Sequence, residues 1–136
     1  MDEILSRKNS EGYTDMTAYK AILSADGFDY RPLVYICSPY SGDIKKNTNN
    51  ARRYCRYAVD KGVIPMCPHL LLPQFMREDT ERDLALFMDL VLLTKCAAVW
   101  VFGNTVTDGM RLEINRAEKR GQEVRFIEEE ELSCMK

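Results

Sequence analysis

The sequence lacks the patterns that mark the commonest metal, nucleotide and disulfide sites. It has one histidine, His69, and none of its five cysteines forms a C-x-x-C pair, so the usual spacing of zinc ligands is absent. It also has neither the G-x-x-x-x-G-K-[ST] loop of P-loop proteins nor a G-x-G-x-x-G turn. We therefore expect no bound metal and no cofactor, and no ATP or NAD fold of those types.

Strong charge and long apolar runs are also missing. The formal net charge is -2, which gives no sign of a nucleic-acid partner. The longest apolar stretch, 84–93, is interrupted by Asp89 and falls short of the roughly 20 residues of a membrane span. The first residues are polar and of mixed charge, unlike a signal peptide. With an odd number of cysteines, two of them in or beside apolar runs, these features predict a reduced, cytoplasmic protein that contacts no membrane.

The 136 residues suit one domain with a core of its own. Residues 1–31 are polar apart from a helix-like stretch at 17–23, and we interpret them as an N-terminal extension. The domain itself is expected over residues 32–136. The acidic run 128–131 near its end is expected to be a solvated tail.

Within the domain, strand-like and helix-like segments alternate. Apolar runs of strand length lie at 33–37, 63–66, 97–102 and 124–127, and helical periodicity covers about 48–61, 80–93 and 110–120. Thr80 or Asp79 is the expected cap of the second helix. Pro65 places the second strand near an edge of the sheet. The order predicts an α/β fold: a small doubly wound parallel sheet between two helical layers, of the flavodoxin or Rossmann-like kind.

The segment 99–117 is the most informative part of the chain. An apolar strand ends at Phe102, a loop rich in Gly and Thr follows, and the next helix carries Glu113 in its opening turns. Ligands of open α/β sheets bind at such strand–loop–helix turns. The positive end of the helix is expected to favour an ionised Glu113, which suits a nucleophile or a stabiliser of positive charge. The alternative is an ordinary exposed glutamate near a helix start.

Asp89 is unusual because its helical neighbours three and four positions away are all apolar. Burial of this carboxyl group would raise its pKa and keep it protonated, as a general acid requires. The alternative is an aspartate that caps a local N–H group or pairs with Arg52 or Arg111. Because parallel strands end at one edge of the sheet, we expect Asp89 to converge with the loops that hold Tyr40, His69 and Glu113.

The aromatic and imidazole side chains in these loops each have two interpretations. Tyr40 would stack on a base or sugar ring, or else cover the edge of the core. Tyr35 lies inside a strand and belongs to the core unless its hydroxyl group reaches the cleft. His69, between two prolines, is either a structural residue or part of the site.

Three motifs together resemble the nucleoside 2-deoxyribosyltransferase superfamily, and in particular its small phage- and bacterial-type branch. They are YICSPYSG (35–42), DLVLLTKCAAVWVF (89–102), and TDGMRLEINRA (107–117) followed by Gly121 and Val124. The resemblance runs from about residue 33 to residue 127. It implies a compact α/β domain that attacks an N-glycosidic bond with retention.

The resemblance also implies roles for individual residues. Glu113 is the nucleophile, Asp89 takes part in proton transfer to the base, and Tyr35 orients the nucleophile. The resemblance places the sugar hydroxyls or a 5′-phosphate at the loop with Thr107 and Gly109. The convergence of the loops adds the other expected substrate contacts: Ser38, Pro39, Tyr40, His69, Gly103, Asp108 and Met110. The expected substrate is a deoxyribonucleoside or its 5′-monophosphate, and the expected reaction is transfer or hydrolysis through a glycosyl-Glu113 intermediate. The alternative function is a non-catalytic nucleotide sensor that uses the same cleft.

The chain departs from the family pattern at two positions of the third motif. Arg111 replaces a small residue, and it would meet a 5′-phosphate, neutralise Glu113 or point outward as a surface arginine. Thr107 stands where some members have Asp or Ser. Known members are oligomers that complete the site with a neighbour's residues, so we expect a homo-oligomer in which residues 1–31 or 126–131 are donated.

Overall fold

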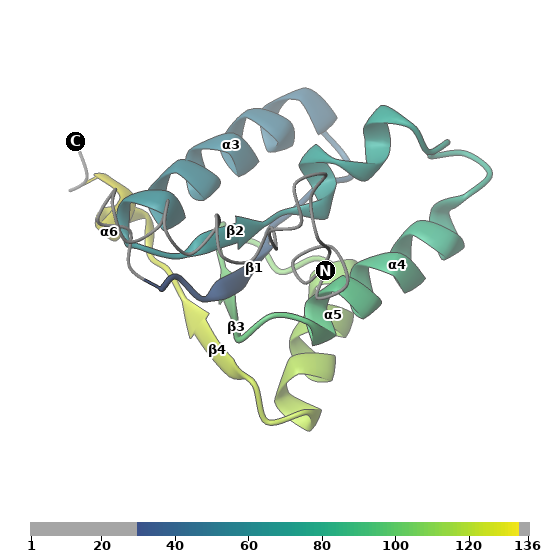
Figure 1. Ribbon diagram of the computed structural model, residues 1–136. Helices are drawn as coiled ribbons and strands as arrows, with labels where there is room; N and C mark the ends of the chain where they lie inside the picture. The colour runs from purple at the N-terminus through teal and green to yellow at the C-terminus, as the bar shows by residue number, and fades with distance from the viewer. Residues whose placement is uncertain (1–29, 134–136) are drawn as a thin grey trace, which may run out of the picture. The chain divides into compact units, whose positions relative to one another are not determined.

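The protein is described here by a computed structural model, which defines residues 30–133. In the labels of Figure 1, the elements are β1 (Leu33–Cys37), α3 (Ile44–Asp60), β2 (Ile64–Met66), the 3-10 turns η1 (Pro68–Leu70) and η2 (Leu72–Gln74), α4 (Arg82–Thr94), β3 (Ala98–Val101), α5 (Asp108–Lys119), β4 (Glu123–Phe126) and α6 (Glu129–Ser133). All four expected strands and all three expected helices of the domain are present. The helix-like stretch 17–23 lies outside the described residues.

The four strands form one parallel sheet in the order β2-β1-β3-β4. Tyr35 of β1 stands opposite Val99 of β3 at the centre of the sheet. β2, which contains Pro65, is an edge strand, as predicted. The chain leaves β1 toward one edge and later returns to pair β3 on its other side. The loops after β1 and β3 therefore diverge at this point, where open α/β sheets bind ligands.

Helices cover both faces of the sheet, which confirms the predicted three-layer α/β architecture (Figure 1). Alternate residues of the central strands point to opposite faces. One face packs against α3 and α6, through Val34, Ile36, Tyr54, Tyr57, Ala58, Trp100, Phe102 and Leu132. The other packs against α4 and α5, through Tyr35, Cys37, Leu93, Val99, Val101, Met110, Ile114 and Ala117.

The first helix, α3, begins at Ile44, four residues before the expected start at Thr48. Asp43 is the reason: its side chain accepts a 3.2 Å hydrogen bond from the backbone N–H of Lys46 and so caps the helix. The helix ends at Asp60, two residues before the predicted stop signal Gly62, whose positive φ of 90° suits a residue without a side chain.

The cap of α4 and the start of α5 also differ from expectation. α4 begins at Arg82, and neither Thr80 nor Asp79 caps it; Glu81 occupies the cap position without a side-chain cap bond. The Glu81 carboxylate instead accepts a hydrogen bond from the N–H of Arg77. α5 begins at Asp108, two residues early, because the Thr107 hydroxyl accepts from the N–H of Met110 at 3.2 Å.

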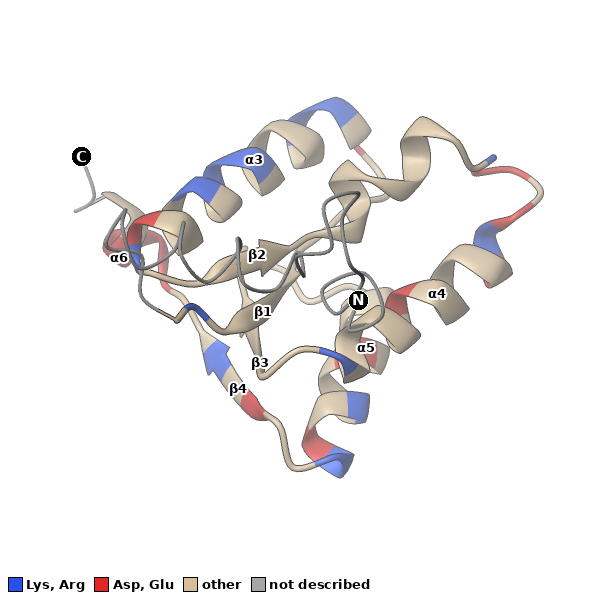
Figure 2. Cartoon of the chain, in the orientation of Figure 1, with Lys and Arg blue, Asp and Glu red and all other residues tan. Residues whose placement is uncertain are grey.

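The acidic run 128–131 was expected to be a solvated tail. Instead, most of it belongs to the short helix α6. Leu132 of this helix is buried in the core beside α3. Figure 2 shows basic residues along α3 and acidic residues on α6. Two contacts join these helices: Arg53 pairs with Glu129 at 2.9 Å, and the Tyr57 hydroxyl donates to Glu131 at 3.2 Å. An anchoring leucine and opposite charges therefore fold this segment onto the domain.

Two bulk expectations are met within the described part of the chain. Its helices are all too short or too polar to cross a membrane. Its cysteines, Cys37, Cys55, Cys67 and Cys96, are all free thiols, in line with the expectation that none serves a disulfide scaffold.

Candidate active site

A cavity of about 460 Å³ opens between the loops that follow β1 and β2, helix α4 and the start of α5. Its volume lies in the range of small-molecule sites. Seven of the expected site residues line its wall together with Asp89 and Glu113: Ser38, Tyr40, His69, Thr107, Asp108, Gly109 and Met110. The predicted convergence of these loops and of Asp89 is therefore found.

Glu113 is held at the inner wall of this cavity by a residue of the central strand. Its side chain is only 2 % exposed. The Tyr35 hydroxyl donates a 2.7 Å hydrogen bond to Oε2 of Glu113, whereas Oε1 has no hydrogen-bond partner among the described residues. Tyr35 is a core residue that does not line the cavity, yet its hydroxyl reaches the carboxylate. Both interpretations of Tyr35 therefore describe part of its role.

The interpretation of Glu113 as an exposed surface residue is wrong, and burial opposes the ionised form that the helix start was expected to favour. Burial raises the pKa of this carboxyl group, and the hydrogen bond from Tyr35 lowers it by less. Arg111 is exposed on α5 and forms no ion pair with Glu113. Of its three expected orientations, the structure therefore places Arg111 at the surface, and Glu113 keeps no cationic partner in the described chain.

Asp89 projects from α4 toward Glu113 and is 8 % exposed. Burial, and to a smaller extent the nearby Glu113 carboxylate, together raise the pKa of Asp89 to about 7. The expected rise is thus present. Pairing with Arg52 or Arg111 is not observed, and Oδ1 lacks a hydrogen-bond partner among residues 30–133.

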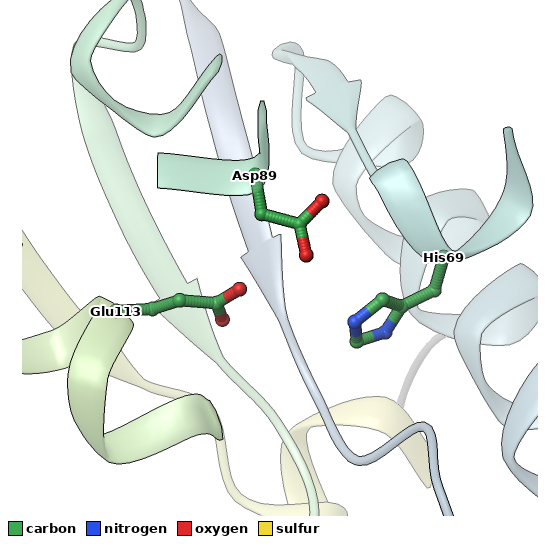
Figure 3. Close-up of side chains that lie close together, drawn as sticks. All are labelled: His69, Asp89 and Glu113. Carbon is green, nitrogen blue, oxygen red and sulfur yellow. The ribbon is translucent and has the colours of Figure 1, made fainter. Parts of the chain in front are cut away.

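His69 lies in the 3-10 turn η1 and faces the two carboxyl groups, as Figure 3 shows. Its ring packs against Tyr40, with the ring centroids 4.9 Å apart. Burial lowers the pKa of His69 to about 4, so the imidazole is neutral at neutral pH. Its Nδ1 and the Oγ of Ser38, a residue 1 % exposed, have no partner in the described part of the chain.

Unpartnered polar atoms are therefore concentrated at one place. Within residues 30–133, four of the five buried side-chain atoms without a hydrogen bond belong to residues of this cavity wall: Ser38, His69, Asp89 and Glu113. Buried polar groups in proteins nearly always have partners. An unpaired cluster of this kind is typical of a site whose ligand supplies the missing bonds.

One nitrogen of His69 and one carboxylate oxygen each from Asp89 and Glu113 lie within 4.8 Å of one another. The sequence argument against a metal considered only the single histidine and the spacing of the cysteines. It could not foresee that two carboxylates from different helices would join the histidine. Among the described residues, this is the group with the donor atoms to hold a metal ion.

Pro39 and Gly103 do not line the main cavity. They border a neighbouring cavity of about 480 Å³ near α3, which shares Ser41 and Thr107 with the first. Gly103 has φ 101°, and a Cβ atom there would lie 3.1 Å from Cδ of Pro39. The two residues therefore position the loops after β1 and β3 against each other.

The outer wall of the main cavity was missed by the sequence argument. It is formed by the segment between η2 and α4, through Met76, Arg77 and Glu78, and by the first turns of α4, through Arg82, Asp83, Ala85 and Leu86. A partial signal was available, because positions 82, 85 and 86 share a helical face with Asp89. The turn before α4 has no such periodicity, and only the folded chain places it here.

The fold and this cavity define a Rossmann-like α/β domain with a carboxyl-lined pocket at the carboxyl ends of its strands. The chain belongs to the family described as domain of unknown function (DUF7768), whose model matches residues 32–127. The match covers the described domain from the residue before β1 to the residue after β4. No curated protein matches the sequence.

Proposed function

We propose that this protein cleaves the N-glycosidic bond of a deoxyribonucleoside or its 5′-monophosphate and transfers the sugar to another base or to water. The observation that carries the proposal is the Tyr35–Glu113 hydrogen bond. It fixes Oε2 of a buried carboxylate, while Oε1 has no partner among the described residues that form the cavity wall. A positioned carboxylate of this kind suits nucleophilic attack on an acetal carbon.

In the first half of the reaction, Oε1 of Glu113 attacks C1′ of the sugar. The C1′–N bond breaks, and its electron pair goes to the base nitrogen. Asp89, whose raised pKa of about 7 keeps about half of the molecules protonated at neutral pH, gives its proton to the departing base. The products are a neutral base, an ionised Asp89 and a sugar bound covalently to Glu113.

In the second half, the N–H nitrogen of an acceptor base attacks C1′, and the C1′–Oε1 bond breaks. Asp89 takes the proton of the acceptor, which restores both carboxyl groups. When water attacks in place of the base, the result is hydrolysis, and Asp89 again takes the proton of the attacking molecule. Two displacements at one carbon retain the configuration.

The spacing of the two carboxyl groups supports the covalent route. Oxygens of Asp89 and Glu113 lie within 4.8 Å of each other. Retaining glycosidases place their two carboxyl groups about 5–5.5 Å apart, whereas inverting enzymes leave about 6.5–9.5 Å for a water molecule. This spacing is too short to hold a water and a sugar between the two groups.

Two further observations support a nucleoside-sized substrate. The cavity of about 460 Å³ is lined by polar and apolar side chains alike, and its volume suits a small molecule of nucleoside size. The ring of Tyr40 borders it beside His69 and offers a surface for stacking a base. The motif resemblance to nucleoside 2-deoxyribosyltransferases gives independent support.

We place the reaction in the cytoplasm, because the described cysteines are free thiols.

The test measures base release from a panel of deoxyribonucleosides and their 5′-monophosphates, with and without a free acceptor base. We expect Glu113→Gln to lose activity by at least about 10³-fold, because the amide is a poor nucleophile. Glu118→Gln is the matched control, since Glu118 is an exposed residue of the same helix. Mass spectrometry of the quenched wild type should detect one sugar unit attached to Glu113.

Unchanged turnover in Glu113→Gln would refute the covalent mechanism. No turnover on any substrate, together with a rise in melting temperature on adding nucleotides, would instead assign the cavity to a non-catalytic sensor. In that case Glu113 would be a binding residue.

We also infer that the chain works as a homo-oligomer. One face of α4 carries Leu84, Phe87 and Val91, all at least 40 % exposed, and lies opposite the face that carries Asp89. An exposed apolar helix face suits a subunit interface. Light scattering gives the test, and a fully active monomer would contradict it.

A further inference from the structure

We propose that His69, Asp89 and Glu113 bind one divalent transition-metal ion when no substrate is present, and that the ion blocks the active site. The binding itself follows from the geometry of the three side chains. The inhibitory effect rests on the function proposed above.

The three side chains come from η1, α4 and α5 and face a common space (Figure 3). Their candidate ligand atoms lie within 4.8 Å of one another. The centre of a triangle with sides of that length is about 2.8 Å from each corner, so shifts of about 0.7 Å would bring all three to the 2.0–2.2 Å of metal–nitrogen and metal–oxygen bonds. Small side-chain rotations provide such shifts without moving the backbone.

Unpartnered atoms give a second and independent indication of a ligand. Oδ1 of Asp89 and Oε1 of Glu113 have no hydrogen-bond partner in the described chain, although both residues are more than nine-tenths buried. Nδ1 of His69 is unpartnered as well. Two buried carboxyl groups side by side also repel each other when ionised, and no described cationic side chain pairs with either. A cation between the two carboxyl groups would bind the unpartnered oxygens and cancel the repulsion between the two negative charges.

The donor set selects the kind of ion. One imidazole nitrogen with two carboxylate oxygens suits Zn²⁺, Co²⁺ or Mn²⁺, whereas Mg²⁺ prefers oxygen ligands and retains several waters. The cavity opens directly onto the three side chains, so water can fill the remaining coordination positions. Three protein ligands with an open position are typical of accessible rather than closed metal sites.

Occupation by the ion would stop the proposed glycosyl transfer for a direct reason. The ion would bind Oε1 of Glu113, the oxygen assigned to attack the sugar, while Oε2 remains hydrogen-bonded to Tyr35. It would also take the Asp89 carboxylate, so the leaving base would receive no proton. We therefore expect inhibition that competes with substrate and is reversed by a chelator.

The experiment titrates full-length, chelator-treated protein with Co²⁺ and Zn²⁺, using calorimetry and visible absorption. We expect one ion per chain and visible cobalt bands, and no comparable binding of Mg²⁺. Asp89→Asn, Glu113→Gln and His69→Gln should each weaken binding by more than the roughly 10–100-fold that changes outside the ligand set cause. Glu118→Gln should bind like the wild type, and melting curves verify that each variant is folded.

Cysteines are the competing ligands, since Cys67 is buried next to η1 with Cys55 packed close by. A thiolate on cobalt adds an intense near-ultraviolet charge-transfer band, which we expect to be absent, and Cys67→Ser should leave the affinity unchanged. The proposal is overturned by such a band, by the absence of one-to-one binding, or by binding that the three ligand variants do not weaken.

These measurements need no substrate turnover. If the protein cleaves nucleosides but binds no ion, the proposed function stands and the metal site is refuted. If it binds the ion at these residues but cleaves nothing, the metal site stands and the inhibitory role falls with the proposed function.

Discussion

The hydroxyl group of Tyr35 donates a 2.7 Å hydrogen bond to Oε2 of Glu113, joining the central strand to helix α5 across 78 positions of sequence. Both side chains are almost fully buried, with exposed fractions of 1 % and 2 %. The bond fixes the carboxylate at the cavity wall and leaves its other oxygen free. It also stabilises the ionised form of Glu113 against the effect of burial on its pKa.

Replacing Tyr35→Phe should slow the proposed reaction by about 10–100-fold, the equivalent of one buried hydrogen bond to a charged group. The loss should fall on kcat rather than KM, because Tyr35 is not part of the cavity wall. The pKa of Glu113 should rise further, so the acidic limb of the kcat/KM profile should move to higher pH. Steady-state kinetics across pH measures both effects.

A change in KM alone, with the acidic limb unmoved, would contradict this role for Tyr35. Tyr57→Phe gives a control for the loss of a buried phenol hydroxyl elsewhere, since Tyr57 donates to Glu131 on the other face of the sheet. That variant should leave the pH profile unchanged.

Asp89→Asn should stabilise the protein at high pH and have little effect at low pH. The folded-state pKa of Asp89 is about 7 against an ordinary value of 3.8, so the folded protein binds a proton that the unfolded chain has lost. The stability of the wild type therefore declines as pH rises from about 4 to 7. Asparagine is always neutral, and it should gain about 2–4 kcal/mol over the wild type at pH 8.

Urea unfolding at pH 4.5 and at pH 8 measures this difference. Asp83→Asn is the matched control, because Asp83 is an exposed aspartate of the same helix. An equal effect of Asp89→Asn at both values of pH would show that Asp89 is ionised in the folded protein.

The His69 imidazole should remain neutral down to about pH 5. Burial lowers its pKa to about 4, whereas a histidine in an unfolded chain titrates near 6.5. Because His69 is the only histidine, its ring signals in an NMR titration need no assignment. We expect constant chemical shifts from pH 8 to pH 5 in the native protein and a midpoint near 6.5 in urea.

The linked effect on stability has the opposite sign to that of Asp89. Below pH 6.5 the unfolded chain takes up a proton that the folded protein does not, so this contribution destabilises the fold as pH falls toward 4. A native midpoint near 6.5 would mean that solvent or the neighbouring carboxylates of Asp89 and Glu113 offset the effect of burial.

Thr107→Val should lower the free energy of unfolding by about 1 kcal/mol, since it removes the hydroxyl that caps α5. Thr107→Ser keeps the hydroxyl group and should stay close to the wild type. Denaturant unfolding distinguishes them. Equal losses in both variants would show that the methyl group of Thr107, not its hydrogen bond to Met110, supports the start of this helix.

Gly103→Ala should destabilise the protein by more than Gly62→Ala. Both residues have a positive φ, at 101° and 90°, so both substitutions incur the cost of a left-handed backbone, about 1–2 kcal/mol. Only at Gly103 does the added Cβ atom meet a neighbour, Cδ of Pro39 at 3.1 Å. Thermal unfolding compares the two, and equal losses would mean that Pro39 moves away freely.

Much of the fold was predictable because local patterns determine it. The apolar run of β1, for example, is uninterrupted because helices cover both of its faces, and glycines end α3 and α5 where a left-handed residue is needed. The starts of these two helices were placed late, because a cap acts through a side chain outside the periodic pattern, as Asp43 and Thr107 do. The segment 128–131 was misjudged because its charges concealed the anchoring contact of Leu132.

Some features of the candidate site were likewise predictable from local patterns, and others were not. The sequence by itself marked Glu113 by its place after a strand and loop, and Asp89 as a carboxyl group on an apolar helix face, since both signals lie within one element. Only the tertiary structure decided that Tyr35 binds Glu113, that His69 joins the two carboxyl groups and that Arg111 points away. These relations depend on strand order and helix orientation, which arise from packing between distant segments and leave no periodic trace in the chain.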